Sequence, residues 1–204
     1  MDKITAILQY WFQGISDQTP DIKNHPSAKR WFMKSPFLDE EIRQRFEPDL
    51  LNAQSGLYKN WESSPQGQLA LVILLDQFAR NIYRNTPKMF DFDSSALKIT
   101  LKMIDEKLDQ SLQLIERVFL YMPLQHAEDL SLQKKSLECF KDMVNVSNVK
   151  SRQNTAYYVY TLGYAQKHYD IIARFGRFPH RNEVLNRVSI QEEVEFLKGP
   201  GSKF

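Results

Sequence analysis

The stretch that decides the fold is residues 65–83, which read PQGQLALVILLDQFARNIY. It contains the longest unbroken apolar run of the chain, Leu69–Leu75. Pro65 suits the first turn of a helix, where its missing N–H costs little, and Ser63 or Ser64 can cap that turn. A helix that is apolar on every side has to be buried on every side. We therefore expect residues 65–83 to form the central helix of the protein.

The segments on both sides of this stretch repeat the helical spacing of apolar residues. Glycine is scarce, at 7 of 204 residues, and Asn-Gly and Asp-Gly pairs are absent, which argues against β-hairpins. Residues 143–149 alternate apolar and polar side chains without a partner strand, and we interpret them as a connection. The sequence thus predicts an all-α protein, one domain over residues 1–204 with about eight helices. The expected helices are 3–12, a short one near 31–32, one capped by Asp39 that reaches 61 and is kinked or divided at Pro48, 65–83, one from 93 or 94 to 104, 112–122 ended by Pro123, one from 128 or 129 to 144, 152–173, and a last one capped by Ser189 with Glu192.

Composition excludes several classes of protein. The 27 Lys and Arg against 25 Asp and Glu leave a net charge of +2, too balanced for a face that binds nucleic acid. The single cysteine, Cys139, rules out an internal disulfide and a zinc site built from cysteines. The longest apolar run falls far short of the roughly 20 residues that span a bilayer, and the N-terminus has no signal-peptide pattern. We expect a soluble cytoplasmic protein without membrane association, and nucleic acid is not an expected partner.

Charged side chains interrupt the expected central helix near its end. Asp76, Arg80 and Arg84 follow one another at intervals of four, so they line one face of that helix and its exit. Asp76 shares its face with Leu69 and Val72, and a buried carboxylate needs a partner. An ion pair with Arg80 within the helix and a role in a functional site explain this position equally well.

The segment PLQHAED, residues 123–129, ends one expected helix and begins the next. Glu128 and Asp129 suit the start of the second helix, where acids stabilise the exposed N–H groups. His126 has no such structural role. A neutral imidazole at this point can act as a base, a hydrogen-bond donor or a ligand.

The densest charged motif is RFGRFPHRN, residues 174–182, which has three arginines and one histidine but no acid. Gly176 and Pro179 give this loop a defined shape, and its two phenylalanines can anchor it in the core. Arginine forks bind carboxylates and phosphates bidentately, so the motif is a candidate anion-binding loop. Pairing of the arginines with acids of neighbouring helices is an equal alternative. Nucleic-acid binding has less support, because the rest of the chain has no basic stripe.

No motif indicates a cofactor or a metal. The chain has no phosphate-binding glycine loop, no Gly-x-Ser-x-Gly and no dinucleotide fingerprint. No helical His-x-x-x-His or Glu-x-x-His pair supports a metal site built from His126, His168 or His180 with Asp76 or Glu128. We interpret His168, which shares a helix face with tyrosines, as a hydrogen-bonded core residue. We expect no cofactor, and the sequence does not decide whether the protein is an enzyme.

Five stretches together resemble a bacterial family, the domain-of-unknown-function family 924. They are WFMKSP (31–36), LLDQFARNIYR (74–84), FLYMPLQHAED (119–129), RFGRFPHRN (174–182) and PGSKF (200–204). The family usually has Glu-His-Ser-Glu where this chain has Gln125-His126-Ala127-Glu128. The resemblance covers nearly the whole chain. It implies an all-helical fold like the tetratricopeptide α-α superhelices, with an irregular bundle as the alternative, and it implies no activity.

Two functions from different classes follow from these residues. In the first, the protein binds, and can act on, a small phosphate- or carboxylate-bearing ligand in a pocket lined by arginine and histidine. In the second, it is a tetratricopeptide-like module that presents a groove to a protein or peptide without catalysis. We favour the first, because its charged and imidazole side chains lie on three segments, and apolar residues of each segment anchor it against the core.

The first function makes a geometric prediction. The charged ends of the three segments should meet within about 12 Å of one another in one concave pocket. His126 and His180 are then the candidate acid and base, and Asp76 is the residue that orients a neighbour. The expected ligand-binding residues are Arg80, Arg84, Arg174, Arg177, Arg181, Asn182 and Glu128.

Overall fold

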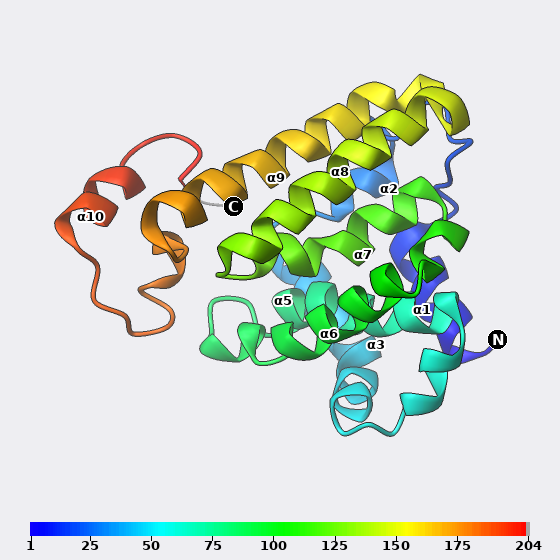
Figure 1. The fold of residues 1–204 in the computed structure, drawn as a ribbon. Helices are drawn as coiled ribbons and strands as arrows, with labels where there is room; N and C mark the ends of the chain where they lie inside the picture. The colour runs from blue at the N-terminus through cyan, green and yellow to red at the C-terminus, as the bar shows by residue number, and fades with distance from the viewer. Residues whose placement is uncertain (203–204) are drawn as a thin grey trace.

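Every regular element within residues 1–202 of the computed structural model is helical, which confirms the all-α prediction (Figure 1). Lys203 and Phe204, which end the expected domain and the last matching stretch, lie outside the described residues. The α-helical and π-helical elements are α1 (Lys3–Phe12), α2 (Pro26–Arg30), α3 (Pro36–Gln54), α4 (Pro65–Val72), the π-helical segment η2 (Ile73–Phe78), α5 (Ala79–Ile82), α6 (Asp93–Asp105), α7 (Leu114–His126), α8 (Leu130–Lys150), α9 (Thr155–Phe175) and α10 (Gln191–Leu197). Short 3-10 turns lie between them: η1 (Lys59–Ser63), η3 (Pro87–Phe90), η4 (Leu108–Ser111), η5 (Arg152–Asn154) and η6 (Pro179–Arg181).

The central helix lies where the sequence predicts it, but it is not one regular helix. Ser64 caps its start by accepting a hydrogen bond from the N–H of Gly67. Every side chain from Leu69 to Leu75 is at most 3% exposed. The regular helix α4 then widens into the π-helical turn η2 before α5 resumes. The central position is therefore confirmed, and the expectation of a continuous helix over residues 65–83 is corrected.

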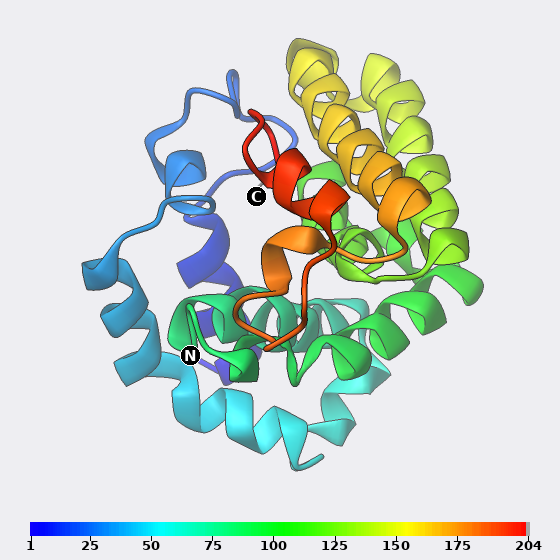
Figure 2. The same cartoon turned by 90° about the vertical axis from the view of Figure 1, so that its left-hand side faces the viewer.

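Other helices surround this central one. Helices α1, α3, α6 and α7 all contact α4 or η2. On the far side of α7, helices α8 and α9 lie side by side and antiparallel along one edge of the molecule (Figures 1 and 2). The finer expectation of a tetratricopeptide-like superhelix stays a prediction.

Aromatic rings join the N-terminal segment to this core. The ring of Trp11 lies 5.5 Å from that of Phe78 and 5.3 Å from that of Phe119, in edge-to-face contacts. The ring of Trp31, just after α2, lies 4.8 Å from Phe119. Because such pairs stabilise by about 0.5–1.5 kcal/mol beyond the area that they bury, they fix α1 and α2 against α7.

Two expectations about helix ends are wrong in the middle of the chain. Pro123 does not end α7 but lies inside it, and the hydroxyl of Thr100 donates to the carbonyl of Leu120 in the same turn, 2.8 Å away. Residues 143–149 are not a connection but the last turns of α8. Met143 and Ser147, four residues apart, are the buried positions there, so this segment has a helical rather than an alternating buried face.

Two expected caps are also displaced. Ser35 caps α3, with Pro36 in its first turn, and Asp39 turns instead to another helix. This helix continues through Pro48 and ends at Gln54. At α10 the carboxylate of Glu193 accepts the N–H of Ile190, one residue later than the predicted pair of Ser189 and Glu192. The hydroxyl of Ser189 accepts a hydrogen bond from Asn182, at 3.0 Å.

The C-terminal segment forms a small unit at one end of the molecule. Gly176, with φ of 67°, ends α9 in the left-handed region, and the chain turns back through η6 toward α10 (Figure 2). A small apolar cluster of Ile171, Ile172 and the fully buried Phe178 fixes this turn. The segment is thereby brought beside the connection between α7 and α8.

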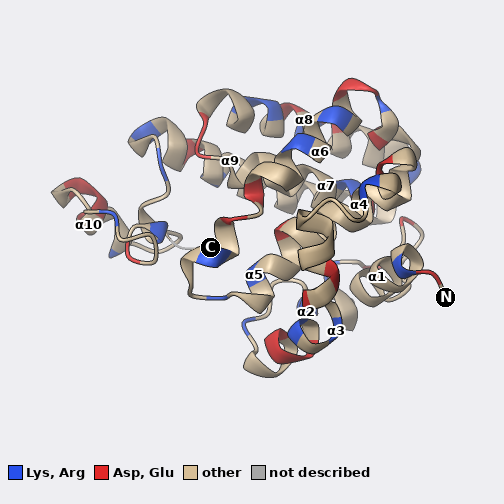
Figure 3. Ribbon diagram, turned by 90° about the horizontal axis from the view of Figure 1, so that it is seen from below, with Lys and Arg blue, Asp and Glu red and all other residues tan. Residues whose placement is uncertain are grey.

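Charges of both signs are interspersed over the elements seen from below (Figure 3). Within residues 1–202, none of the helices combines the length and the apolar character that a membrane crossing requires.

The burial of the central helix predicts a large stability loss on truncation there. Leu74 is fully buried, whereas Leu57 is 67% exposed and provides a matched control. Leu74→Ala should lower the free energy of unfolding by about 2–5 kcal/mol, because it leaves a cavity that its neighbours cannot fill. Leu57→Ala should change it by less than about 0.5 kcal/mol. Urea denaturation of both variants checks this, and equal losses would contradict the assignment of the central helix.

Candidate functional site

A fully buried carboxylate, Asp76, lies within η2. Its Oδ1 is 2.6 Å from Nδ1 of His126 and 3.3 Å from Nη2 of Arg80, and its Oδ2 accepts a hydrogen bond from Gln77. A buried carboxylate without such partners would be very unfavourable. Burial alone raises the pKa of the Asp76 carboxyl, but the interactions with His126, Arg80 and Gln77 outweigh burial and hold the pKa below its ordinary value. Asp76 is therefore ionised.

Of the two arginines that follow Asp76 at intervals of four, Arg80 contacts Asp76 and Arg84 pairs with another acid. In a regular helix the four-residue spacing would align Asp76, Arg80 and Arg84 on one face, as the sequence suggests. The wider turn shifts the register, and Arg84 lies beyond the end of α5. Arg84 binds Asp39 of α3 instead, with Nε 2.6 Å and Nη2 2.8 Å from its carboxylate oxygens. Short π-helical turns of this kind frequently occur at functional sites.

His126 is the last residue of α7 and is held there by a side chain of α8. The buried Gln133 donates to the carbonyls of Gln125 and Ala127, at 2.7 and 2.8 Å, and so fixes the end of α7. Because Asp76 is ionised, Nδ1 of His126 carries the proton and donates it, which leaves the lone pair on Nε2. Burial and the charge of Arg80 lower the pKa of His126, so the ring is neutral at pH 7.

Arg181 of η6 brings a second arginine to this group. Its guanidinium lies over the rings of Phe90 and Phe178, 4.8 and 4.5 Å from their centroids. Its Nη1 is 4.0 Å from Asp93, whose carboxylate already accepts two hydrogen bonds from Arg80 at 3.0 and 3.2 Å. Within residues 1–202 the buried Nε of Arg181 has no hydrogen-bond partner. Burial and the charge of Arg80 lower the pKa of Arg181 to about 10, so it stays charged at pH 7.

Two further histidines border the group. The ring of His168 of α9 lies 6.2 Å from that of His126 and 5.5 Å from that of Phe178. Nδ1 of His168 is 2.8 Å from the carbonyl of Tyr164, and the residue is 6% exposed, which confirms the prediction of a hydrogen-bonded core residue. Burial lowers the pKa of His168 to about 3, and burial together with Arg181 lowers that of His180 to about 4. Both rings are therefore neutral at pH 7.

Glu128 connects the start of α8 to the C-terminal segment. Its carboxylate accepts the N–H of Phe178 at 2.7 Å and two bonds from Arg187 at 2.6 and 2.9 Å. The interpretation of Glu128 as a cap is therefore wrong, because its carboxylate turns to Arg187. Asp129 does cap α8, by accepting the N–H groups of Ser131 and Leu132.

The remaining residues of the arginine-rich motif pair with α10. Arg177 forms a bidentate pair with Glu193, at 2.6 and 2.7 Å, and Arg174 pairs with Glu192 on the surface, at 2.8 Å. Asn182 donates to Glu193 as well. For these side chains the alternative that the sequence left open, pairing with acids of a neighbouring helix, describes the structure.

The structure thus brings the three predicted segments into contact through part of their charged residues. Asp76, Arg80, His126 and Arg181, together with Asp93, form what we call the polar cluster. Glu128 and His180 lie beside it, whereas Arg84, Arg174, Arg177 and Asn182 pair with other acids. That the cluster opens into a ligand pocket stays a prediction.

Sequence reasoning overlooked two charged residues of this region. Asp93 suggested only a helix cap, and Arg187 belonged to no motif. Arg187 binds Glu128 across 59 positions of the chain, and no local spacing relates Asp93 to Arg80. Such pairs have no signal in one sequence, because they depend on how the helices pack.

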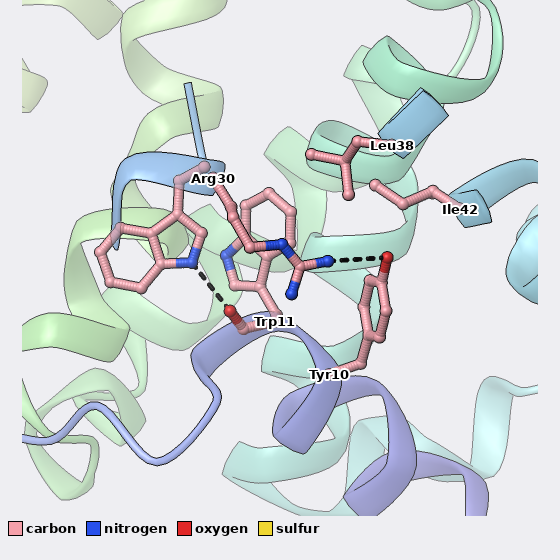
Figure 4. Close-up of a pocket in the computed structure, with 6 residues that line it drawn as sticks. Tyr10, Trp11, Arg30, Leu38 and Ile42 are labelled. Atoms are coloured by element: carbon pink, nitrogen blue, oxygen red, sulfur yellow. Dashed lines mark hydrogen bonds between the residues drawn. The ribbon is translucent and has the colours of Figure 1, made fainter. Parts of the chain in front are cut away.

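Two hollows of the structure share no lining residue with the polar cluster. Within residues 1–202, no three His, Cys, Asp or Glu side chains are arranged to hold a metal ion. One hollow, of about 10 Å³, lies beside Trp11 and is bordered by Arg30, which donates to the hydroxyl of Tyr10 at 3.2 Å (Figure 4). Such a volume holds about one water molecule. A larger hollow, of about 440 Å³, lies between α3, α4 and α6.

The buried histidines predict that the protein loses stability below neutral pH. An unfolded histidine protonates near its ordinary pKa of 6.5, whereas His168 stays neutral in the folded protein down to about 3. The contribution of the buried histidine to the free energy of unfolding is therefore fully present above pH 6.5. It decreases as the pH falls below this value, by up to about 1.4 kcal/mol per pH unit for each such group. Urea denaturation at about pH 7.5 and about pH 5, on both sides of this pKa, should show a smaller decrease in the free energy of unfolding for His168→Gln than for the wild-type protein. An unchanged slope would show that His168 does not carry this dependence.

Comparison with known proteins agrees with the fold. A solved structure of a protein of unknown function from Agrobacterium tumefaciens is similar, with 30% sequence identity and a TM-score of 0.78 over 96% of this chain and 97% of that chain. No curated protein matches the chain. The model of a family described as bacterial protein of unknown function, DUF924, matches residues 7–201, which include the whole polar cluster. The resemblance found in the sequence is thus confirmed, and the chain belongs to the DUF924 family of bacterial proteins.

Proposed function

We propose that this protein binds a small anion, a phosphate- or carboxylate-bearing molecule, at the polar cluster. The observation that carries the proposal is the state of Arg181. Its side chain is 9% exposed, and its Nε has no hydrogen-bond partner within residues 1–202. A buried donor left unsatisfied costs about 1–3 kcal/mol, which natural structures rarely retain without a reason.

An anion supplies the missing acceptor. The five N–H donors of an arginine match the oxygens of carboxylates and phosphates, and two parallel hydrogen bonds form at once. Such a ligand accepts from Nε of Arg181 and from the neighbouring amino group. The rings of Phe90 and Phe178 hold the guanidinium in place, so little side-chain entropy is lost on binding.

The ligand enters at the Asp93 edge of the cluster. Asp93 is 25% exposed, Arg80 16% and His126 12%, so the cluster reaches the surface there. The contact of Asp93 with Arg181 is long, at 4.0 Å, and burial raises the pKa of Asp93. A bound anion therefore replaces this weak contact while Asp93 keeps its hydrogen bonds to Arg80.

His126 is the group that acts on a bound ligand. Asp76 holds its Nδ1–H, so the basic Nε2 is available to accept a proton from a hydroxyl group or water of the complex. His180 is neutral at pH 7, because its pKa is about 4. It is therefore a neutral neighbour of the anion, and we assign the role of base to His126.

Replacement of Arg181 by an apolar residue of similar length tests the proposal. Inorganic phosphate should raise the melting temperature of the wild-type protein. At a hundredfold excess over Kd, the bound ligand adds about 2.7 kcal/mol to the free energy of unfolding. Arg181→Met should abolish this rise. It should leave the stability without phosphate unchanged or higher, because it removes a buried, incompletely paired charge. Differential scanning calorimetry with phosphate, and in parallel with acetate, measures both effects.

The control is Arg152→Gln, which removes an exposed arginine at the start of η5 and should keep the phosphate effect. Two results contradict the proposal. One is the absence of any stabilisation of the wild-type protein by phosphate or acetate. The other is a large loss of stability in Arg181→Met, which would make Arg181 a structural residue.

A protein- or peptide-binding module is the second candidate, and one observation favours it. Phe32, Met33 and Phe37, near the junction of α2 and α3, are 58%, 48% and 80% exposed. Exposed apolar groups of this kind can mark interaction surfaces. This candidate moves ahead of the first if the polar cluster binds neither phosphate nor carboxylate.

A further inference from the structure

The hollow of about 440 Å³ between α3, α4 and α6 shares no residue with the polar cluster. Its volume lies within the range of about 300–1,000 Å³ that is usual for small-molecule sites. Side chains of opposite character divide its lining into an apolar floor and a basic rim. The floor includes Leu71, Leu75 and Ile99, and the rim includes Lys59, Lys98 and Lys102.

The floor is aliphatic rather than aromatic. Leu71 and Leu75 belong to the central helix and Ile99 to α6, and they are 3%, 2% and 9% exposed. The aromatic residue of the lining, Tyr58, already stacks on Trp61, with ring centroids 4.1 Å apart and planes at 6°. An alkyl chain therefore fits this floor, because Leu71, Leu75 and Ile99 are aliphatic.

The rim is positively charged. The lining contains three lysines and a single acid, Glu62, which pairs with Lys102 at 3.3 Å. Lys59 and Lys98 are exposed, and the lining offers no further carboxylate to balance them. A negative group at the end of an apolar ligand would be attracted to these two ammonium groups.

We propose that this hollow binds a single-chain amphipathic anion, an alkyl carboxylate whose chain lies on Leu71, Leu75 and Ile99 and whose carboxylate faces Lys59 and Lys98. Burial of the chain supplies most of the affinity, since each methylene removed from water contributes about fourfold. The lysines select the negative head group. The proposal is independent of anion binding at the polar cluster.

Titration calorimetry with decanoate tests the proposal. Decanoate should bind, and hexanoate should bind more than about tenfold more weakly because it buries fewer methylenes. Decyltrimethylammonium, which has the same chain but a positive head group, should bind more than about tenfold more weakly than decanoate. Lys98→Glu should weaken decanoate binding about fivefold, and higher salt should weaken it too. Lys141→Glu, at an exposed position of α8, is the matched control and should leave the affinity unchanged.

A second variant tests the location without a change of charge. Ala53 lines the hollow from α3 and is partly exposed, so Ala53→Trp can fill the hollow without entering the core. It should abolish decanoate binding while circular dichroism shows an unchanged helical content. Retained binding in a folded Ala53→Trp variant would overturn the proposal.

Competition separates this site from the polar cluster. Saturating inorganic phosphate should leave the decanoate affinity unchanged, because phosphate has no alkyl chain to place on the apolar floor. If phosphate displaces decanoate and Lys98→Glu has no effect, the carboxylate binds at Arg181 and this proposal fails while the first one stands. Equal binding of decanoate and decyltrimethylammonium would also overturn it, because the lysines would then have no role.

Discussion

The burial of one carboxylate imposes a condition on much of this structure. Asp76 lies in the most apolar helix of the chain and is fully buried. A charge at such a position is tolerated only if partners compensate for the loss of water. Those partners come from the same helix, through Arg80 and Gln77, and from the end of α7, through His126. The central helix and α7 therefore have to pack in one register.

The residues that bind Asp76 need further partners of their own. Arg80 contacts both Asp76, at 3.3 Å, and Asp93 at the start of α6, at 3.0 Å, so it links the central helix to α6. The end of α7 has to stop where His126 meets Asp76, and the buried amide of Gln133 satisfies the carbonyls left free there. Asp76 and the end of α7 are thus satisfied by polar groups of neighbouring elements, as expected for networks in a medium of low polarity.

The C-terminal segment completes the cluster by two kinds of interaction. Phe178 buries an apolar anchor, and Glu128 holds the backbone beside it together with Arg187. Arg174 and Arg177 use their charge to attach α10, while Arg181, on the other side of Phe178, turns inward. One short motif therefore has a structural part and a part that joins the cluster, and the phenylalanine between them separates the two.

The three histidines in and beside the cluster, His126, His168 and His180, give this region its chemical character. Burial keeps all three neutral at pH 7, so the positive charge of the region belongs to arginine. A neutral histidine whose Nδ1–H is held by a carboxylate is a base rather than an acid. The same burial that makes these rings neutral also makes the native state sensitive to acid, because the unfolded chain takes up protons that the folded chain does not.

The sequence by itself determined the helical class, the central place of residues 65–83, a serine cap at position 63 or 64 and three segments that contribute to the cluster. These features depend on apolar spacing and on residues within one turn of each other, which a single chain displays directly. The tertiary structure decided the π-helical turn, the continuation of α7 through Pro123, and the partners of Asp39, Glu128 and Arg181. Those features depend on contacts between residues far apart in the chain, and local propensity gives way to packing wherever a buried charge has to find its counterpart.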